Sequence, residues 1–224
     1  MKKNNIILIG FMGVGKGTVA RAMVKEFAMV GLKSHFREDG KEEVCGNGTL
    51  VPYKNKAGTE VTVPNEGNKE AGIVGINSHF QYVIDTDDLI ESMENRAIKK
   101  IFAVDGEAYF RNLEKKTALW LESSVENTII STGGGFYRQE NLKNIGTVIY
   151  LKSSFDGILK RIKKAPNAKN KLKNRPLLQN KKEAMKLYDT RVKEYERVAD
   201  IIVDVENRDL EFIVKEILGQ IKWR

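Results

Sequence analysis

Gly10-Phe11-Met12-Gly13-Val14-Gly15-Lys16 is the stretch that decides the fold of this chain. It matches the pattern G-x-x-x-x-G-K, it follows the apolar run from Asn5 to Gly10, and it opens a helical pattern from Lys16 to Val30. Glycines let a backbone wrap around phosphate groups, while amides at a helix N-terminus and a lysine supply positive charge. The stretch is therefore predicted to be a phosphate-binding loop between a strand and a helix.

The loop departs from the usual pattern directly after its lysine. Gly17 stands where Ser or Thr usually ligates Mg²⁺, and Thr18 follows one position later. The same Gly-Lys-Gly-Thr occurs in adenylate kinases, so phosphate binding does not depend on that hydroxyl. The metal is then held by nucleotide oxygens, water or carboxylates, or by Thr18 if the helix start is shifted. The predicted nucleotide contacts of the loop are Gly13, Val14, Gly15, Lys16, Gly17 and Thr18.

Short apolar stretches alternate with amphipathic helical patterns along the rest of the chain. The stretches are Tyr82-Val83-Ile84, Thr128-Ile129-Ile130, Thr147 to Leu151 and Ile201-Ile202-Val203, and the helical patterns are Asp88 to Glu94, Glu107 to Ser123, Phe155 to Ile162, Lys181 to Val198 and Leu210 to Ile221. This alternation is typical of a parallel sheet covered on both faces. We expect an α/β fold with three layers and a five-stranded parallel sheet, of the kind found in P-loop NTPases, and one domain spanning residues 1–224.

Two segments interrupt this rhythm. Residues 31–80 are rich in Gly, Lys, Glu and Asn, and Leu50 to Val63 has the pattern of a hairpin around Lys56-Ala57-Gly58. We interpret this segment as an insertion that joins the first helix to the second sheet strand, and we expect it to serve self-association or partner contact. Residues 163–180 are lysine-rich and are predicted to form a lid over the nucleotide.

Composition narrows the class of protein. The formal charge of +8 comes mostly from lysines spread along the chain, and their densest patch lacks the interleaved aromatic side chains that stack on bases, so nucleic-acid binding is not expected. No apolar run approaches the roughly 20 residues that cross a bilayer, so no membrane role is expected. Cys45 has no partner for an intrachain disulfide, which is typical of a reducing compartment. We expect a cytoplasmic monomer, with self-association through the insertion as the alternative.

Two carboxylates follow the apolar stretch Tyr82-Val83-Ile84. Asp85 and Asp87 come at the end of that predicted strand, and ligands of α/β sheets bind at the carboxyl ends of the strands. They are therefore candidates for an acceptor site. The alternative interpretation is a helix N-cap, for which Asp87 or Asp88 would serve.

The motifs that follow the phosphate-binding loop resemble, in their order, those of a known family. They are Gly106-Glu107-Ala108-Tyr109-Phe110-Arg111 with Glu114, then Gly133-Gly134-Gly135, then Asn174-Arg175-Pro176-Leu177, then Arg191 followed by Tyr195. The set resembles shikimate kinase, and the resemblance covers nearly everything except the insertion.

The resemblance implies a role for each matching position at the acceptor side. Asp87 contacts the acceptor hydroxyls and acts as the base, and Asp85 acts near Mg²⁺ through water. Arg111 and Arg191 hold the carboxylate of shikimate, and the backbone of Gly133, Gly134 and Gly135 lines the acceptor pocket. Independently of the resemblance, guanidinium groups select carboxylates because they bind them through two parallel hydrogen bonds.

The resemblance also implies contacts on the nucleotide side. Arg175 is carried by the mobile lid over the phosphates, and Arg161 lies near the position of an adenine-contacting arginine, where the local match is looser. The expected reaction is transfer of the γ-phosphate of ATP to the 3-hydroxyl of shikimate with Mg²⁺, using Lys16, Asp87 and Arg175 as catalytic residues. Two alternatives remain open: a kinase of a nucleoside monophosphate or another carboxylated alcohol, and a nucleotide-responsive binding module.

Overall fold

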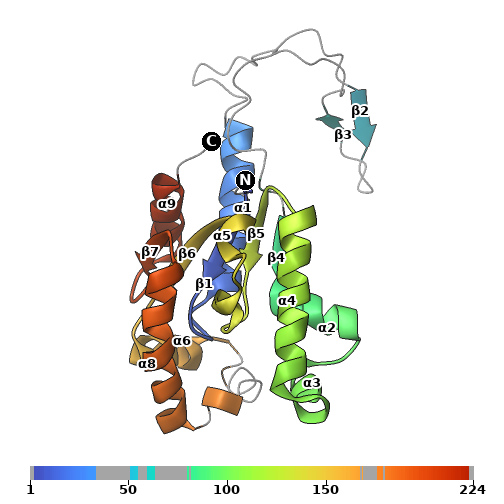
Figure 1. The fold of residues 1–224 in the computed structure, drawn as a ribbon. Coiled ribbons are helices and arrows are strands. Elements are labelled where there is room, and N and C mark those ends of the chain that lie inside the picture. Colours follow the sequence, from blue (N-terminus) through green and yellow to red (C-terminus); the bar gives the residue numbers. More distant parts are fainter. Residues whose placement is uncertain are drawn as a thin grey trace. The chain divides into compact units, whose positions relative to one another are not determined.

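A parallel five-stranded sheet forms the centre of the protein (Figure 1). The computed structural model describes residues 3–33, 51–54, 60–63, 80, 82–166, 168, 176–178 and 180–221. The spatial order of the strands is β4-β5-β1-β6-β7, and each neighbouring pair is parallel. The bounds are Ile6–Ile9 for β1, Tyr82–Asp85 for β4, Thr128–Ser131 for β5, Thr147–Lys152 for β6 and Ile201–Asp204 for β7. The predicted fold class is confirmed.

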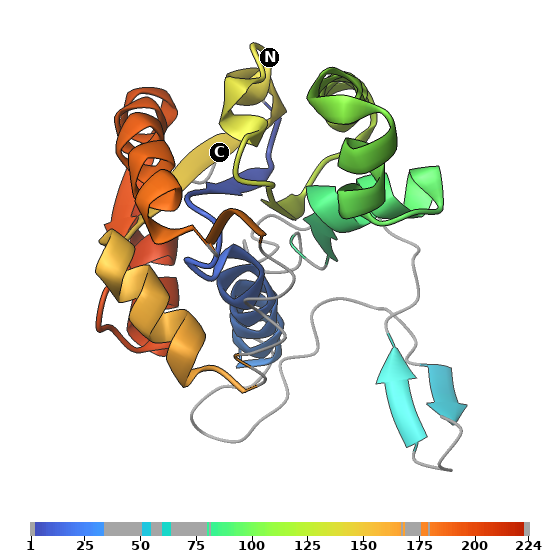
Figure 2. The ribbon, with the colours of Figure 1, turned by 90° about the horizontal axis from the view of Figure 1, so that it is seen from below.

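Helices cover both faces of the sheet. In Figures 1 and 2, α4, α5 and α8 lie on one face, and α1 and α9 lie on the other. The bounds of these helices are Lys16–Lys33 for α1, Gly106–Ser124 for α4, Leu142–Ile145 for α5, Lys181–Val198 for α8 and Leu210–Gln220 for α9. The shorter elements are α2 (Thr86–Glu94), α3 (Ile98–Val104), η1 (Phe136–Arg138), α6 (Phe155–Lys164) and η2 (Pro176–Leu178).

The sequence of the central strands explains their burial. All residues of β1 and β5 are buried, because a strand covered by helices on both sides exposes neither set of alternating side chains. The edge strand β4 is only partly buried. Since every strand of the sheet runs in the same direction, the segments that follow β1, β4 and β5 meet at one edge of it, which is where open α/β sheets bind ligands.

A smaller apolar cluster holds α2, α3 and α4 together. Ile90, Ile101, Phe110 and Leu113 form it, and Ile101 is fully buried. Neither α3 nor the short α5 was predicted from the sequence, and α2 begins at Thr86, two residues earlier than expected. This cluster fixes the position of α4, which carries one of the candidate arginines.

The chain divides into two compact units, Met1–Phe27 with His79–Arg224, and Ala28–Ser78. Within the second unit, β2 (Val51–Lys54) and β3 (Glu60–Val63) form an antiparallel pair, as the hairpin pattern predicted, while its turn lies outside the described residues. The single domain and the insertion at 31–80 remain predictions, as does the lid at 163–180, most of which the structure does not describe. Of the described helices, none is long and apolar enough to span a bilayer.

Candidate active site

The phosphate-binding loop connects β1 to α1, as the sequence predicted. Gly13 and Gly15 have φ angles of +86° and +105°, which other residues rarely adopt. The Lys16 ammonium donates hydrogen bonds to the carbonyl oxygens of Gly10 (2.8 Å) and Phe11 (3.3 Å). A phosphate group entering the loop would compete with these carbonyls for a charged donor that is already in place.

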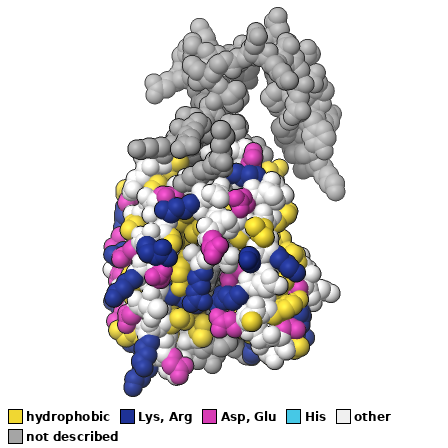
Figure 3. Space-filling model, in the orientation of Figure 1, with side chains coloured by type: hydrophobic (Ala, Val, Ile, Leu, Met, Phe, Trp, Pro, Cys, Tyr) yellow, Lys and Arg dark blue, Asp and Glu magenta, His cyan; other side chains and the backbone are white. Residues whose placement is uncertain are grey.

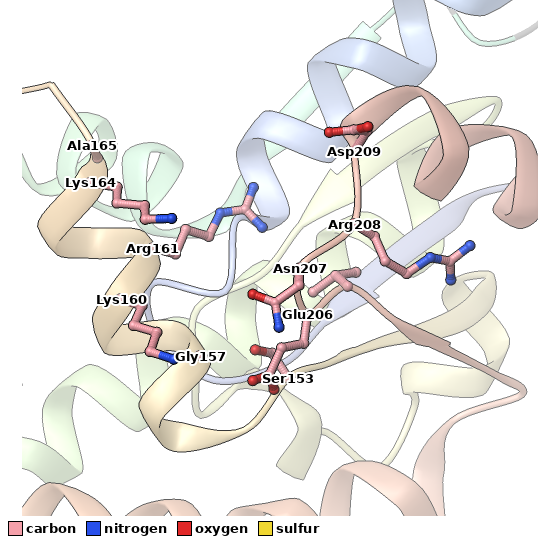
Figure 4. A pocket seen from close by; sticks show the side chains of 11 residues that line it. Ser153, Gly157, Lys160, Arg161, Lys164, Ala165, Glu206, Asn207, Arg208 and Asp209 are labelled. Atoms are coloured by element: carbon pink, nitrogen blue, oxygen red, sulfur yellow. The ribbon is translucent and has the colours of Figure 1, made fainter.

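A pocket of about 430 Å³ opens beside this loop (Figure 4). Lys160, Arg161 and Lys164 reach into it from α6, opposite the turn that carries Glu206 and Asn207. The guanidinium of Arg161 lies where a side chain on Gly15 would have to be, so it packs directly on the phosphate-binding loop. Burial lowers the pKa of Arg161. Arg161 therefore lies between the pocket and the loop, and α6 gives the pocket a cationic wall.

Asp85 lies at the end of β4, where it caps α2. Its Oδ1 accepts a hydrogen bond from the Asp87 amide at 3.0 Å, and its Oδ2 accepts one from the Ser131 hydroxyl at 2.8 Å. The sequence suggested Asp87 or Asp88 as the alternative cap. The capping residue is instead Asp85, because the helix begins at Thr86, directly after the strand.

Asp87 does not cap the helix, and its carboxyl lies against the turn formed by Gly133 to Gly135, here called the Gly-rich turn. A Cβ on Gly133 would lie 3.1 Å from the Asp87 carboxyl carbon, so the absence of a side chain there lets the carboxyl pack on the backbone. Burial raises the pKa of Asp87 from its ordinary 3.8 to about 6; the charges of Asp85, Glu114 and Asp88 add to the rise, and Lys16 opposes it. A carboxyl with this pKa is suited to exchanging a proton near neutral pH.

The next two glycines of the turn face the two candidate arginines. A Cβ on Gly134 would lie 3.0 Å from Arg191 Nη1, and one on Gly135 would lie 3.1 Å from the guanidinium carbon of Arg111. The three consecutive glycines thus contact a partly buried carboxyl from α2, an arginine from α8 and an arginine from α4. The structure brings together the acceptor-site residues that the sequence predicted.

Arg111 is already paired with two carboxylates of its own helix. Its Nη1 donates to Glu114 at 2.6 Å, while its Nε and Nη2 donate to Glu107 at 3.1 and 2.8 Å. The Glu114 side chain is 1% exposed and that of Glu107 is 62% exposed. Burial raises the pKa of Glu114, and its pairing with Arg111 opposes that rise. Glu114 is a fixed support of the arginine, whereas Glu107 is free to move into solvent.

Arg191 is buried beside the turn, with only 6% of its surface exposed. Its Nε has no hydrogen-bond partner among the described residues. The neighbouring Tyr195 hydroxyl donates to the Gly134 carbonyl at 2.6 Å, which anchors the turn to α8. A buried guanidinium with an unused donor is unfavourable unless an anion is to be bound there.

Sequence reasoning missed Arg138, which lies on η1 directly after the glycines. Its guanidinium stacks on the Tyr137 ring at 5.6 Å, and its charge lowers the pKa of Glu107 together with Arg111 and Arg191. Figure 3 shows Lys and Arg side chains gathered in the lower middle of the displayed face, in the region between α4 and α8 of Figure 1. In the sequence, the only signal for Arg138 is its position three residues after the last of the three glycines.

The structure does not test Arg175, which lies outside the described residues, and it does not bring Thr18 into the site. Thr18 is exposed on α1, which begins at Lys16, so the shifted helix start under which it was expected to ligate Mg²⁺ is not seen. Its role stays a prediction.

A phosphate-binding loop that is joined at one sheet edge by a partly buried carboxyl and two arginines defines the class of P-loop small-molecule kinases. Comparison with known proteins narrows this class. The family model "Shikimate kinase" matches residues 77–222. The shikimate kinase of Helicobacter hepaticus is 29% identical over 95% of this chain and 93% of its own length. That of Dictyoglomus turgidum is 36% identical over 62% of this chain and 81% of its own length.

Solved structures agree with this result. The crystal structure of shikimate kinase from Aquifex aeolicus is 27% identical, with a TM-score of 0.59, and the alignment covers 96% of this chain and 94% of that one. Shikimate kinase from Acinetobacter baumannii, solved in complex with shikimate, shares the fold with a TM-score of 0.63 at 24% identity, over 98% of this chain and 96% of that one. This chain belongs to the shikimate kinase family, and it is an enzyme that phosphorylates shikimate with ATP and Mg²⁺.

Proposed function

We propose that the residues around the Gly-rich turn bind shikimate and direct phosphoryl transfer to its 3-hydroxyl. The observation that carries the proposal is the set of three glycines in contact with Asp87, Arg191 and Arg111. One turn thereby places two groups that bind a carboxylate next to one that accepts a proton. Shikimate carries both a carboxylate and hydroxyl groups, so one molecule would engage all three side chains.

The acceptor carboxylate would bind to Arg191 and Arg111. Arg191 offers its buried Nε, which has no hydrogen-bond partner among the described residues. Arg111 offers its Nε and Nη2, which now donate to the exposed Glu107. Glu107 is the carboxylate that yields, because Glu114 is buried on the other side of Arg111. On binding, the carboxylate of shikimate would replace that of Glu107, so the positive charge of Arg111 would stay paired with a negative one.

Asp87 would act as the base. Above a pH of about 6 it is ionised, and it would accept the proton of the reacting hydroxyl as the phosphoryl group is transferred. Lys16 supplies a positive charge close enough to lower the pKa of Asp87.

The residues present fit ATP and Mg²⁺. Lys16, now bonded to loop carbonyls, would bind the phosphates together with the loop amides, and the pocket beside Arg161 would hold the base of the nucleotide. The Asp85 carboxylate, directed by Ser131 and the Asp87 amide, would hold the metal through its water ligands. When bound, MgATP supplies the phosphoryl group and neutralises its developing charge. Arg175 would add a further positive charge from the lid.

Substitution of each arginine tests these assignments. Arg111→Met and Arg191→Met should weaken shikimate binding by about 10- to 150-fold, since each removes a charged hydrogen bond worth roughly 1.5–3 kcal/mol. ATP affinity, measured by calorimetry, should stay the same. Arg197→Met is the matched control, because Arg197 lies exposed on the same helix as Arg191, paired with Glu194. An equal loss of ATP affinity in the Arg111 or Arg191 variants would refute the assignment.

The acceptor itself is tested by ADP release. Purified protein with MgATP should release ADP on addition of shikimate and not on addition of a nucleoside monophosphate. The opposite result would refute the proposed acceptor.

We also infer that the enzyme works as a monomer in the cytoplasm. ATP, its phosphoryl donor, is an intracellular metabolite, and Cys45 has no partner for an intrachain disulfide. Light scattering of the purified protein at micromolar concentration should give the mass of one chain, and a dimer mass would contradict the inference.

A further inference from the structure

The residue after the loop lysine has no side chain that could ligate a magnesium ion. In phosphate-binding loops of this pattern a Ser or Thr hydroxyl at that position ligates the metal, and here the position is Gly17. Since α1 begins at Lys16, Gly17 is in the register that the pattern requires. The site therefore lacks a side-chain hydroxyl where the loop usually provides one.

A hydroxyl from a different strand lies next to this gap. A Cβ on Gly17 would lie 3.7 Å from Ser131 Oγ. Ser131 ends β5, which pairs with β1, and its Cα is registered with that of Leu8 just before the loop. The side chain is 1% exposed and therefore fixed in place. A water molecule at the position of the missing Ser or Thr oxygen would be within hydrogen-bonding reach of it.

The hydrogen bond that Ser131 makes leaves it able to accept another. Its proton is donated to Asp85 Oδ2 at 2.8 Å, and no hydrogen bond to its oxygen from another described residue is found, so the oxygen can accept one from a water molecule in the gap. Asp85 is held in turn by the Asp87 amide at its other oxygen. A serine and a carboxylate joined by a hydrogen bond thus offer acceptors beside the gap, and metal-bound water molecules need acceptors because they are strong donors.

We propose that Ser131, together with Asp85, replaces the missing loop hydroxyl by holding a water ligand of Mg²⁺ from the second coordination shell. Magnesium favours this arrangement, since it gives up its water reluctantly and is commonly bound through few protein ligands and the nucleotide phosphates. The proposal rests on the use of MgATP in this site. It assigns Ser131 a role in metal binding that the purely structural interpretation, a partner for the α2 cap, does not include.

Substitutions at Ser131 and Gly17 separate the two interpretations. Mn²⁺ affinity of the ADP complex, followed by electron paramagnetic resonance, is the readout, with ADP affinity in EDTA as the measure of an intact nucleotide site. Ser131→Ala should weaken Mn²⁺ binding by about 10- to 100-fold, the usual effect of losing a second-shell partner, while ADP affinity in EDTA is unchanged. Ser131→Cys, which keeps the volume and accepts hydrogen bonds poorly, should do the same if the alanine variant does not fold.

Restoring the loop hydroxyl should make Ser131 dispensable. Gly17→Ser fits without strain, since the nearest atoms to its Cβ are Arg21 Nη1 at 3.4 Å and Ser131 Oγ at 3.7 Å. In the Gly17→Ser variant, the additional Ser131→Ala substitution should lower Mn²⁺ affinity by less than about threefold, because the hydroxyl of the new serine then binds the metal directly. Gly219→Ser, on α9 with nothing near its Cβ, is the control for a serine in a helix and should change nothing.

The outcomes are distinct from those that test the proposed function. An unchanged Mn²⁺ affinity in Ser131→Ala, or an equal loss with and without the Gly17→Ser substitution, would overturn the role of Ser131. ADP binding that is indifferent to Mg²⁺ and Mn²⁺ in the unsubstituted protein would instead overturn the metal site on which the proposed function relies.

Discussion

Replacing Asp87 with asparagine should stabilise the ligand-free protein while it removes most of the activity. The carboxyl is partly buried and lies near Asp85 and Glu114, and these surroundings disfavour its charged form. Asparagine keeps the shape of the side chain and carries no charge at any pH. The variant therefore removes the unfavourable free energy of keeping a charged carboxylate at this position in the folded protein at neutral pH.

The size of this effect follows from the pKa. It is raised in the folded protein to about 6 from an ordinary 3.8, so the neutral form is favoured by folding. The resulting stabilisation is fully present below pH 3.8 and is lost as the pH rises through about 6. Relative to Asp87→Asn, the unsubstituted protein should be less stable by about 2 kcal/mol at pH 5 and about 3 kcal/mol at pH 8.

Urea unfolding at pH 5 and pH 8 measures this difference. Asp88→Asn is the control, because Asp88 is the exposed neighbour of Asp87 in the same helical turn and its removal should change stability little. The reasoning would be refuted if Asp87→Asn were no more stable than the unsubstituted protein at pH 8, or if its advantage were the same at both pH values.

The remaining predictions concern catalysis and the insertion. First, kcat/KM for shikimate should fall tenfold per pH unit below a pH of about 6, as Asp87 becomes protonated, and a flat profile down to pH 5 would contradict its role as the base. Second, Glu107→Gln should lower KM for shikimate by up to about fivefold with kcat unchanged, because the competing carboxylate on Arg111 is gone; a rise in KM would mean that Glu107 positions the arginine instead. Third, a short Gly/Ser linker in place of residues 34–79 should leave kcat and KM for both substrates similar, because loop length costs little stability and the segment joins a helix to the amino end of a strand. A folded, ATP-binding deletion variant without turnover would show that the insertion completes the active site.

Elements with a strong local pattern were predictable from the sequence. The buried strands appear as uninterrupted apolar runs, and the polar residues after them meet at one edge because parallel strands place all such segments together. The short helix α3 has no such pattern, since Ala97 provides no side-chain cap and the helix depends on burying Ile101 against α2 and α4. Tertiary packing, which no local pattern records, decides its existence.

Details of the candidate site depended on where elements begin and on which side chains meet. Three aspartates lie within four positions where β4 ends, and which of them caps α2 is decided by the exact end of the strand. The pairing of Arg111 with both Glu107 and Glu114 was possible from their spacing on one helix. That Glu114 is buried and Glu107 exposed follows only from the packing of α4 on its neighbours.

The contact of three charged side chains with one glycine turn has a consequence for how thermal motion affects the reaction. Asp87, Arg191 and Arg111 all pack on Gly133 to Gly135, so we expect a displacement of that turn to shift the base and both carboxylate anchors together. The distance from the bound hydroxyl to its base would then vary less than the distance from that hydroxyl to the phosphates on the loop after β1. Fluctuations of the protein should therefore alter the approach of donor to acceptor more than the readiness of the acceptor to lose its proton.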